Sequence, residues 1–181
     1  WSPDLEIDLA CRSDQACIEQ YRDLLFDVVR RLSRSQRPVA FEVSGGLDSS
    51  AIFAVAADLK RQGLLCAPEM NGFTLDFRGD PDADETDYCR AVGAHVGRSI
   101  REVLPAHPPI SWYQETACHF MDIAGFPNGV MGQSISHLAA AGGHRVLLNG
   151  IGGDQWLSGS ELSYAEALSG WRGNELLELL V

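Results

Sequence analysis

The sequence is poor in positive charge. Lysine and arginine together number 14, Lys60 is the only lysine, and 25 acidic residues give a formal net charge of −11. Proteins that bind nucleic acid need a basic surface that displaces counterions from the phosphates. The composition therefore argues against a nucleic-acid partner. The four arginines between Arg30 and Arg37 are expected to lie at a solvated helix end, where they complement the helix dipole.

Other features are missing as well. No apolar run approaches the ~20 residues that span a bilayer, and the polar residues 1–4 lack the apolar stretch of a signal peptide. The five cysteines form no C-x-x-C pair, so we expect reduced thiols in a cytoplasmic protein with no membrane partner. The absence of an initiator methionine and of all but one lysine suggests a piece of a longer protein.

Predicted strands and helices alternate along the chain. Short apolar segments bounded by Gly and Pro are typical of strands, and apolar residues spaced three and four apart are typical of helices. The alternation predicts an α/β protein with a doubly wound, mainly parallel sheet. The predicted strands are residues 39–43, 72–77, 99–104 and 144–149. The predicted helices are residues 17–32, 50–62, 84–96, 112–121 and 132–141, with two helical pieces after residue 160.

The segment Ser-Gly-Gly-Leu-Asp-Ser-Ser, residues 44–50, lies between the first predicted strand and its helix. Backbone N–H groups and the dipole at a helix N-terminus favour bound phosphate, and Gly45 and Gly46 let the backbone approach a ligand closely. Asp48 would repel phosphates unless a cation lay between them, so it is a candidate Mg²⁺ ligand. Three serine hydroxyls offer further donors to phosphate oxygens: Ser44, Ser49 and Ser50.

This segment matches neither of two common nucleotide motifs. The Walker A pattern needs G-x-x-x-x-G-K-[ST], and the dinucleotide fingerprint needs G-x-G-x-x-G. The missing lysine argues against transfer of a γ-phosphoryl group. The structural alternative is a helix N-terminus whose glycines and serines serve only for capping.

A second glycine-rich turn, residues 149–159, follows the fourth predicted strand and places Asp154 after its glycines. Ligands of doubly wound sheets bind beyond the carboxyl ends of the strands, where the strand order reverses. If the order is 3-2-1-4, both loops flank one crevice, in which Asp48 and Asp154 bridge a Mg²⁺–pyrophosphate group. The turn at residues 74–76 would form the adenine side. Taken alone, Asp154 is equally explained as a helix cap.

These motifs carry a resemblance. Residues 44–49 resemble the pyrophosphate loop of the N-type ATP pyrophosphatases. Phe-Thr-Leu-Asp-Phe at residues 73–77 and Leu-Asn-Gly-Ile-Gly-Gly-Asp at residues 148–154 are similar to the synthetase domain of asparagine synthetase, β-lactam synthetase and lasso-peptide cyclases. The resemblance implies an adenine nucleotide alpha hydrolase-like fold within a larger synthetase domain. The implied divisions are a helical lead-in at 1–37, the ATP pyrophosphatase core at 38–159 and the start of a truncated helical part at 160–181.

The resemblance implies an ATP-dependent carbon–nitrogen ligase of the asparagine synthase type. A small-molecule or peptide carboxylate attacks the α-phosphate of ATP, pyrophosphate leaves with Mg²⁺, and an amine displaces AMP. A glutaminase domain would supply ammonia. The residues implied to bind ATP are Ser44, Gly45, Gly46, Leu47, Asp48, Ser49, Ser50, Leu75, Asn149 and Gly150. Those implied for catalysis and for Mg²⁺ are Asp48 and Asp154.

Three residues depart from the family pattern. Ile151 and Gln155 stand where the family usually has glutamates in Gly-Glu-Gly-x-Asp-Glu. Isoleucine cannot handle protons during attack by ammonia, which favours a relative with another nucleophile, such as an internal amine that closes a ring. Glu42 replaces an apolar residue that lies near adenine in the family. Because the family's downstream lysine is absent, we expect this chain alone to bind ATP–Mg²⁺ weakly without turnover.

Two other functions could use the same loops. A tRNA-modifying enzyme of the same superfamily would share the first loop, but the acidic charge and the lack of a C-x-x-C pair argue against it. A non-catalytic nucleotide-binding module would sense ATP through the same loops without pyrophosphate release.

Overall fold

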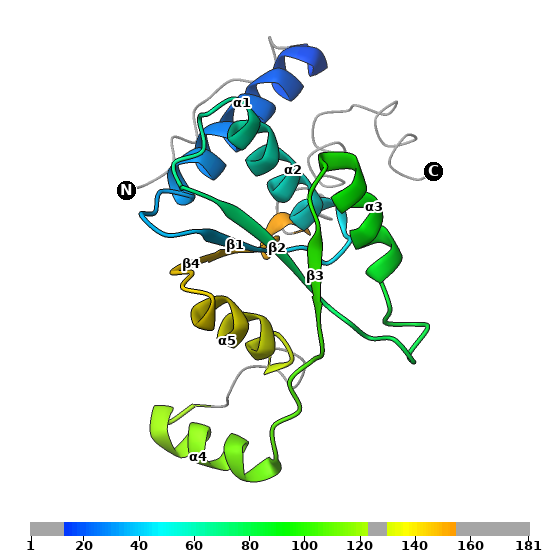
Figure 1. The fold of residues 1–181 in the computed structure, drawn as a ribbon, viewed down its shortest axis with the longest axis vertical. Coiled ribbons are helices and arrows are strands. Elements are labelled where there is room, and N and C mark those ends of the chain that lie inside the picture. The colour runs from blue at the N-terminus through cyan, green and yellow to red at the C-terminus, as the bar shows by residue number, and fades with distance from the viewer. Residues whose placement is uncertain (1–12, 123–129, 155–181) are drawn as a thin grey trace, which may run out of the picture. The chain divides into compact units, whose positions relative to one another are not determined.

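A computed structural model describes residues 13–122 and 130–154. The chain divides into two compact units, residues 1–150 and residues 151–181, and the helices and strands in Figure 1 belong to the first. The strands are β1 (Val39–Glu42), β2 (Met70–Leu75), β3 (Ile100–Val103) and β4 (Val146–Leu148). The helices are α1 (Asp14–Leu32), α2 (Leu47–Arg61), α3 (Thr86–Val96), α4 (Ile110–Phe120) and α5 (Gln133–Ala141).

The four strands form one parallel sheet in the order β3-β2-β1-β4. In its register, Val39 of β1 lies opposite Met70 of β2 on one side and Val146 of β4 on the other. This confirms the predicted doubly wound α/β fold and its 3-2-1-4 strand order. The order reverses between β1 and β4, so the carboxyl ends of these strands mark the position where such sheets bind ligands.

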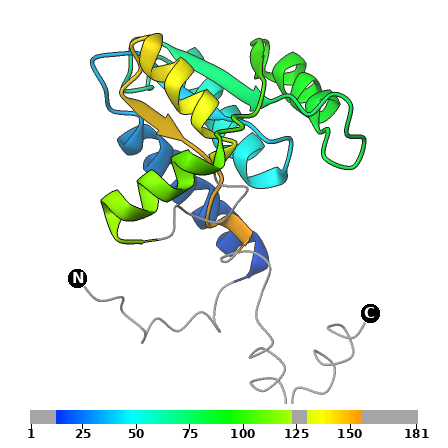
Figure 2. The same ribbon diagram turned by 90° about the horizontal axis from the view of Figure 1, so that it is seen from below.

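Helices cover both faces of the sheet. Helices α1, α2 and α3 lie on one face and α5 lies on the other, as Figures 1 and 2 show. On the first face, Val39 and Phe41 pack beneath α2, where the rings of Phe41 and Phe53 meet edge to face with centroids 5.8 Å apart. On the second face, Ala40 packs near Ile135 of α5. Because both faces are buried, residues 39–41 of β1 are all apolar instead of alternating with polar residues.

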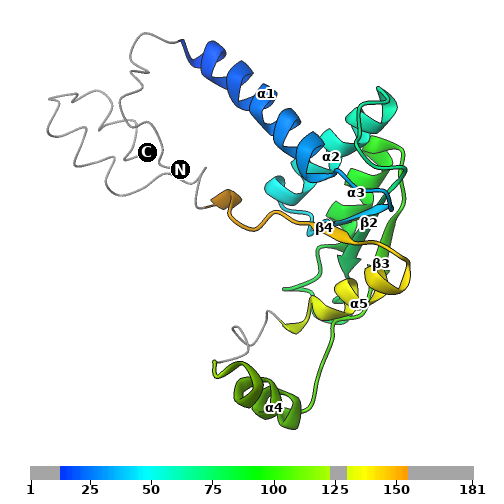
Figure 3. The same ribbon diagram turned by 90° about the vertical axis from the view of Figure 1, so that its left-hand side faces the viewer.

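Two helices extend away from the sheet. Figure 3 shows the N-terminal part of α1 reaching beyond it and α4 lying apart from it, and α4 has no buried residue. Arg30 and Arg31 lie in the last turn of α1 and form ion pairs with Asp27, which confirms the expected helix end for these two arginines. No helix in the described ranges is long and apolar enough to cross a membrane.

Several element boundaries differ from the sequence prediction, and those of α2 and β2 bear on the site. Helix α2 begins at Leu47 instead of residue 50, because Gly46 is its N-cap. Strand β2 begins at Met70 and ends before Asp76, because Val39 already donates to Glu69 O at the start of the ladder. As a result, Asp48 and Ser49 lie in the first turn of a helix.

Candidate functional site

The loop after β1 is shaped by its two glycines. Gly45 has a φ of 87°, in the left-handed region that other residues rarely adopt. Gly46 is the N-cap of α2 and has no side chain to cap the helix. The N–H groups of the first turn are therefore not capped by that residue, and together with the helix dipole they favour an anion at this end of α2.

Ser49 holds the loop closed. Its hydroxyl accepts a hydrogen bond from the Ser44 N–H at 3.0 Å, lies 2.9 Å from the Ser44 hydroxyl, and is 3.4 Å from the Gly46 carbonyl oxygen. The Ser49 residue is 5% exposed. Its position fits a residue that fixes the loop conformation from behind. Ser50 differs, because its hydroxyl is buried and has no hydrogen-bond partner among the described residues.

The contrast between the two serines gives a testable prediction. Replacing Ser49 with alanine leaves the Ser44 N–H without its acceptor and should lower the free energy of unfolding by about 1 kcal/mol. The Ser50→Ala change removes a buried hydroxyl that bonds to nothing described, so it should be neutral or slightly stabilising. Urea unfolding of both variants measures the difference. Equal losses in the two variants would contradict the assigned role of Ser49.

Two other segments approach this loop closely. A Cβ atom added to Gly45 would lie 2.9 Å from Tyr88 Cβ and 3.3 Å from the Glu85 carbonyl oxygen, where α3 begins. A Cβ atom added to Gly150 would lie 2.7 Å from Ser49 N. The loop after β4 thus touches the first turn of α2, as the strand order led us to expect. Glycine at residues 45 and 150 therefore allows three segments to meet closely at the carboxyl end of the sheet.

A small cavity opens beside the loop. Its volume is about 70 Å³, and its lining residues come from the end of β1, the end of β2 and the connection to α3: Glu42, Val43, Ser44, Thr74, Leu75, Phe77, Ala83 and Glu85. A larger hollow of about 700 Å³ shares Leu75, Phe77 and Ala83 with it and continues past the ends of β2 and β3. Leu75, which we expected at the adenine side, therefore lines both spaces.

The remaining predicted site residues are placed as follows. The side chain of Leu47 is 90% exposed, Asp48 is half-buried in the first turn of α2, and Asn149 directly follows β4. Ile151 and Asp154 belong to the second compact unit, so the pairing of Asp48 with Asp154 stays a prediction. Gln155 lies outside the described residues.

Glu42 is the unusual member of the cavity wall. Its carboxyl group is half-buried, and desolvation by burial raises its pKa from the ordinary value of 4.5. Within the described ranges it has no hydrogen-bond or ion-pair partner, and the nearest acid in the cavity wall is the exposed Glu85. A buried carboxylate without a donor destabilises a fold.

This burial predicts a pH-dependent gain from removing the charge. Because the pKa of Glu42 is raised by folding, the folded protein holds the carboxyl proton more tightly than the unfolded chain does. The stability that this proton provides is present below about pH 4.5 and is lost as the pH rises through the folded pKa. Glu42→Gln should therefore be more stable than the parent protein at pH 7. Partial solvent screening keeps the gain under about 1 kcal/mol, or about 2–4 °C in Tm. Thermal melts at pH 4 and pH 7 test this, and a constant difference across that range would contradict it.

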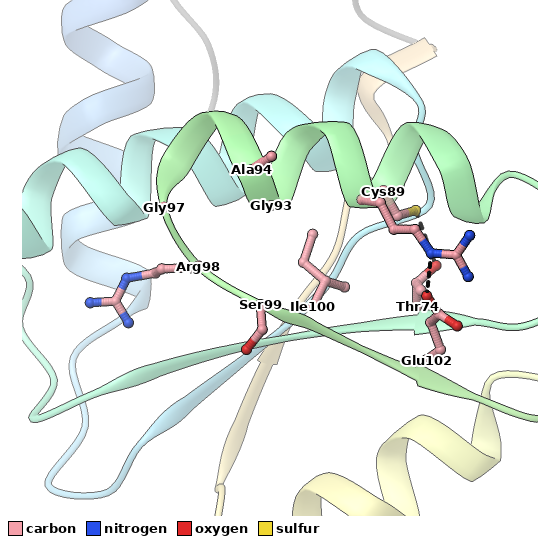
Figure 4. A pocket seen from close by; sticks show the side chains of 10 residues that line it. Thr74, Cys89, Gly93, Ala94, Gly97, Arg98, Ser99, Ile100 and Glu102 are labelled. Atoms are coloured by element: carbon pink, nitrogen blue, oxygen red, sulfur yellow. Dashed lines mark hydrogen bonds and ion pairs between the residues drawn. The ribbon is translucent and has the colours of Figure 1, made fainter.

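A buried thiol lies directly behind the same crevice. Cys89 Sγ donates to the Val43 carbonyl oxygen at 3.1 Å and lies 3.2 Å from Thr74 Oγ1. Figure 4 shows Cys89 and Thr74 at one end of a cavity of about 420 Å³ between α3 and β3, beside the ion pair of Arg90 with Glu102. Burial raises the pKa of the Cys89 thiol, so it stays protonated and can donate. This role of Cys89 could not be predicted from the sequence, because Cys89 and Val43 are far apart along the chain.

The other described cysteines fit the expectation of reduced thiols. Cys17, Cys66, Cys89 and Cys118 are all free in the part of the chain that the structure describes. Cys11 lies outside the described residues.

Comparison with known proteins places this arrangement in a family. The chain is 28% identical over 166 residues to the amidase chyE of Penicillium rubens, over 87% of this chain and 25% of that protein. It is 26% identical to the amidase chry2 of Gibberella zeae, with the same coverage. It is 27% identical over 154 residues to glutamine-hydrolysing asparagine synthetase 1 of Bacillus subtilis, over 84% of this chain and 23% of that protein.

The curated relatives are much longer than this chain, so only part of each relative is matched. The chain spans about a quarter of the length of the curated relatives it matches. The sequence profile described as asparagine synthase matches residues 20–180, which include both glycine-rich loops and all four strands. The chain therefore belongs to the asparagine synthase family, which includes amide-forming synthetases.

Proposed function

We propose that this chain forms the ATP site of a ligase that activates a carboxylate by adenylation, releases pyrophosphate and passes the acyl group to an amine. The observation that carries the proposal is the contact between Gly150 and the first turn of α2. It brings the loops after β1 and β4 together at the carboxyl end of the sheet, where doubly wound proteins bind nucleotides.

The loop at the start of α2 fits a pyrophosphate group. Glycine at residues 45 and 150 lets the start of α3 and the loop after β4 pack directly against this loop, and the N-terminus of α2 supplies N–H donors and a favourable dipole. We assign the pyrophosphate to residues 44–50, with Ser49 holding the loop in shape. AMP would contact Leu75, Asn149 and Gly150.

Mg²⁺ fits the donor chemistry of this site. Asp48 projects from the first turn of α2, and one or two carboxylates with phosphate oxygens are the usual ligands of protein-bound Mg²⁺. We propose Asp48 and Asp154 as those ligands. When bound, the ion neutralises the charge that builds on the leaving pyrophosphate.

In the proposed reaction, a substrate carboxylate oxygen forms a bond to the α-phosphorus of ATP, and the bond from that phosphorus to the bridging oxygen of pyrophosphate breaks. The amine then attacks the acyl carbon, loses a proton and displaces AMP. The protein's contribution to the first step is to position the phosphates and to stabilise their charge.

Two kinds of acceptor amine are candidates: ammonia and an internal amine of the substrate. Relatives named glutamine-hydrolysing asparagine synthetases support a glutaminase domain as the source of ammonia. Ile151 stands where a proton-handling glutamate is expected, and this favours a nucleophile other than ammonia. A cyclase of the lasso-peptide or β-lactam type, in which an internal amine closes a ring, is therefore the second candidate.

The test is a pyrophosphate assay on the full-length protein. ATP is supplied with Mg²⁺ and a panel of amino-acid and peptide carboxylates, and released pyrophosphate and phosphate are measured separately. We expect carboxylate-dependent release of pyrophosphate that stops when EDTA removes the metal. Release of phosphate instead of pyrophosphate would overturn the proposal. Binding of ATP without pyrophosphate release across the panel would favour a non-catalytic nucleotide-binding module.

A further inference from the structure

Glu42 is a charged group that the proposed reaction does not use. It ends β1, two residues before Ser44, and its half-buried side chain lines the same small cavity as Ser44 and Leu75. No donor among the described residues pairs with it. A half-buried carboxylate that faces a cavity and pairs with no described donor is available to accept a hydrogen bond from a ligand.

The cavity beside Glu42 has a volume of about 70 Å³, and Glu42 lies in its wall with Ser44 and Leu75. The neighbouring hollow of about 700 Å³ shares three wall residues with it and can take a ring system. The shared walls, Leu75, Phe77 and Ala83, are apolar, as the faces of a base require.

The other polar groups of the small cavity are less suited to reading a base. Thr74 Oγ1 already interacts with the buried Cys89 thiol. Ser44 belongs to the loop that we assign to pyrophosphate, and its hydroxyl contacts Ser49. Glu85 is exposed. Glu42 is thus the half-buried acceptor of the cavity wall that pairs with no described donor.

We propose that the Glu42 carboxylate selects the nucleotide base by accepting a hydrogen bond from the exocyclic amino group of adenine. This rests on the proposed function, in which the loop beside Glu42 binds the phosphates of ATP. Ser44 follows Glu42 by two residues just beyond the end of β1, so the base and the phosphates would lie along one short segment of the chain. Guanine presents a carbonyl oxygen at the corresponding position, and a carboxylate repels it.

The experiment compares ATP with purine riboside triphosphate, which lacks the exocyclic amino group, by equilibrium binding to the full-length protein with Mg²⁺. GTP is a third ligand. A hydrogen bond to a charged group typically changes affinity about tenfold or more, so the parent protein should bind ATP at least that much more tightly than purine riboside triphosphate. In Glu42→Leu the two affinities should become nearly equal, and Glu42→Gln should keep part of the preference.

Glu85→Gln is the matched control. It removes one negative charge from the wall of the same cavity, so it should change the affinities for both nucleotides together and leave their ratio unaltered. The comparison with Glu85→Gln separates recognition of the base by Glu42 from general repulsion between carboxylates and phosphates. Thermal melts confirm that each variant is folded.

The binding results distinguish failure of the role proposed for Glu42 from failure of the proposed function on which it rests. Equal binding of ATP and purine riboside triphosphate by the parent protein, or an unchanged ratio in Glu42→Leu, overturns the role of Glu42 and leaves ATP binding intact. Tighter binding of GTP than of ATP overturns the adenine assignment. Failure of the parent protein to bind any of the three nucleotides, or inorganic pyrophosphate, overturns the proposed function itself.

Discussion

Replacing Gly150 with alanine should weaken ATP binding about ten- to hundredfold while the protein stays folded. The new Cβ atom would lie 2.7 Å from Ser49 N and 3.1 Å from Ser49 Cα. Both are backbone atoms, so the clash cannot be relieved by a side-chain rotation. Overpacking of this kind typically costs about 1–3 kcal/mol, and about 1.4 kcal/mol corresponds to a tenfold change in affinity. The first turn of α2 must shift, and its N–H groups no longer point at the phosphates.

Gly142→Ala provides the comparison for this variant. Its Cβ atom would also meet close neighbours, at 3.1 Å from ring atoms of His144, whose nitrogens lie near Ala139 O and Asn71 Oδ1. Gly142 ends α5, away from both loops. We expect Gly142→Ala to bind ATP like the parent protein. Titration of ATP against both variants, with thermal melts to show that each is folded, is the measurement. Unchanged ATP affinity in Gly150→Ala would mean that the loops after β1 and β4 do not form one site.

The sequence was sufficient to predict the fold because each signal was local and repeated. Apolar segments such as residues 39–43 alternate with helical patterns, and this alternation leaves few topologies once crossovers are right-handed. Glycine is also a local signal for the end of a helix, and Gly63 and Gly97 both follow their helices, α2 and α3, with positive φ. The start of α2 was placed late because a glycine N-cap has no side chain to signal it.

Features of the site that depend on distant contacts were less accessible. The sequence showed three serines in one loop, and all three were predicted to donate to phosphate. That role stays a prediction; the structure adds that the Ser49 hydroxyl ties the loop together and that the Ser50 hydroxyl is buried. The thiol of Cys89 supports Val43 from a helix 46 residues further along the chain. No local pattern distinguishes such a cysteine from one that merely fills space.

Replacing Asp48 with asparagine should impair the site when Mg²⁺ is present but not when EDTA has removed the ion. With Mg²⁺ present, the variant loses a carboxylate ligand, and pyrophosphate release should fall about 10²–10³-fold, the usual cost of removing one electrostatic stabiliser from an active site. With EDTA, the variant should bind ATP as well as the parent protein or better, because a negative charge that repels phosphate in the absence of a cation has been removed. Loss of favourable interaction with the α2 dipole costs only about 0.3–1 kcal/mol of stability.

A loss of ATP affinity with Mg²⁺ but not with EDTA would identify Asp48 as a metal ligand. A residue needed only for folding would weaken ATP binding with and without Mg²⁺, whereas a ligand weakens it only with the ion. Asp58→Asn is the control, since Asp58 lies near the other end of the same helix and accepts hydrogen bonds from Arg61 and Gln62. It should leave pyrophosphate release and ATP affinity unchanged in both conditions. If Asp48→Asn binds ATP more weakly in EDTA as well, Asp48 shapes the loop instead of holding Mg²⁺, and the proposed Asp48–Mg²⁺–pyrophosphate contact is wrong.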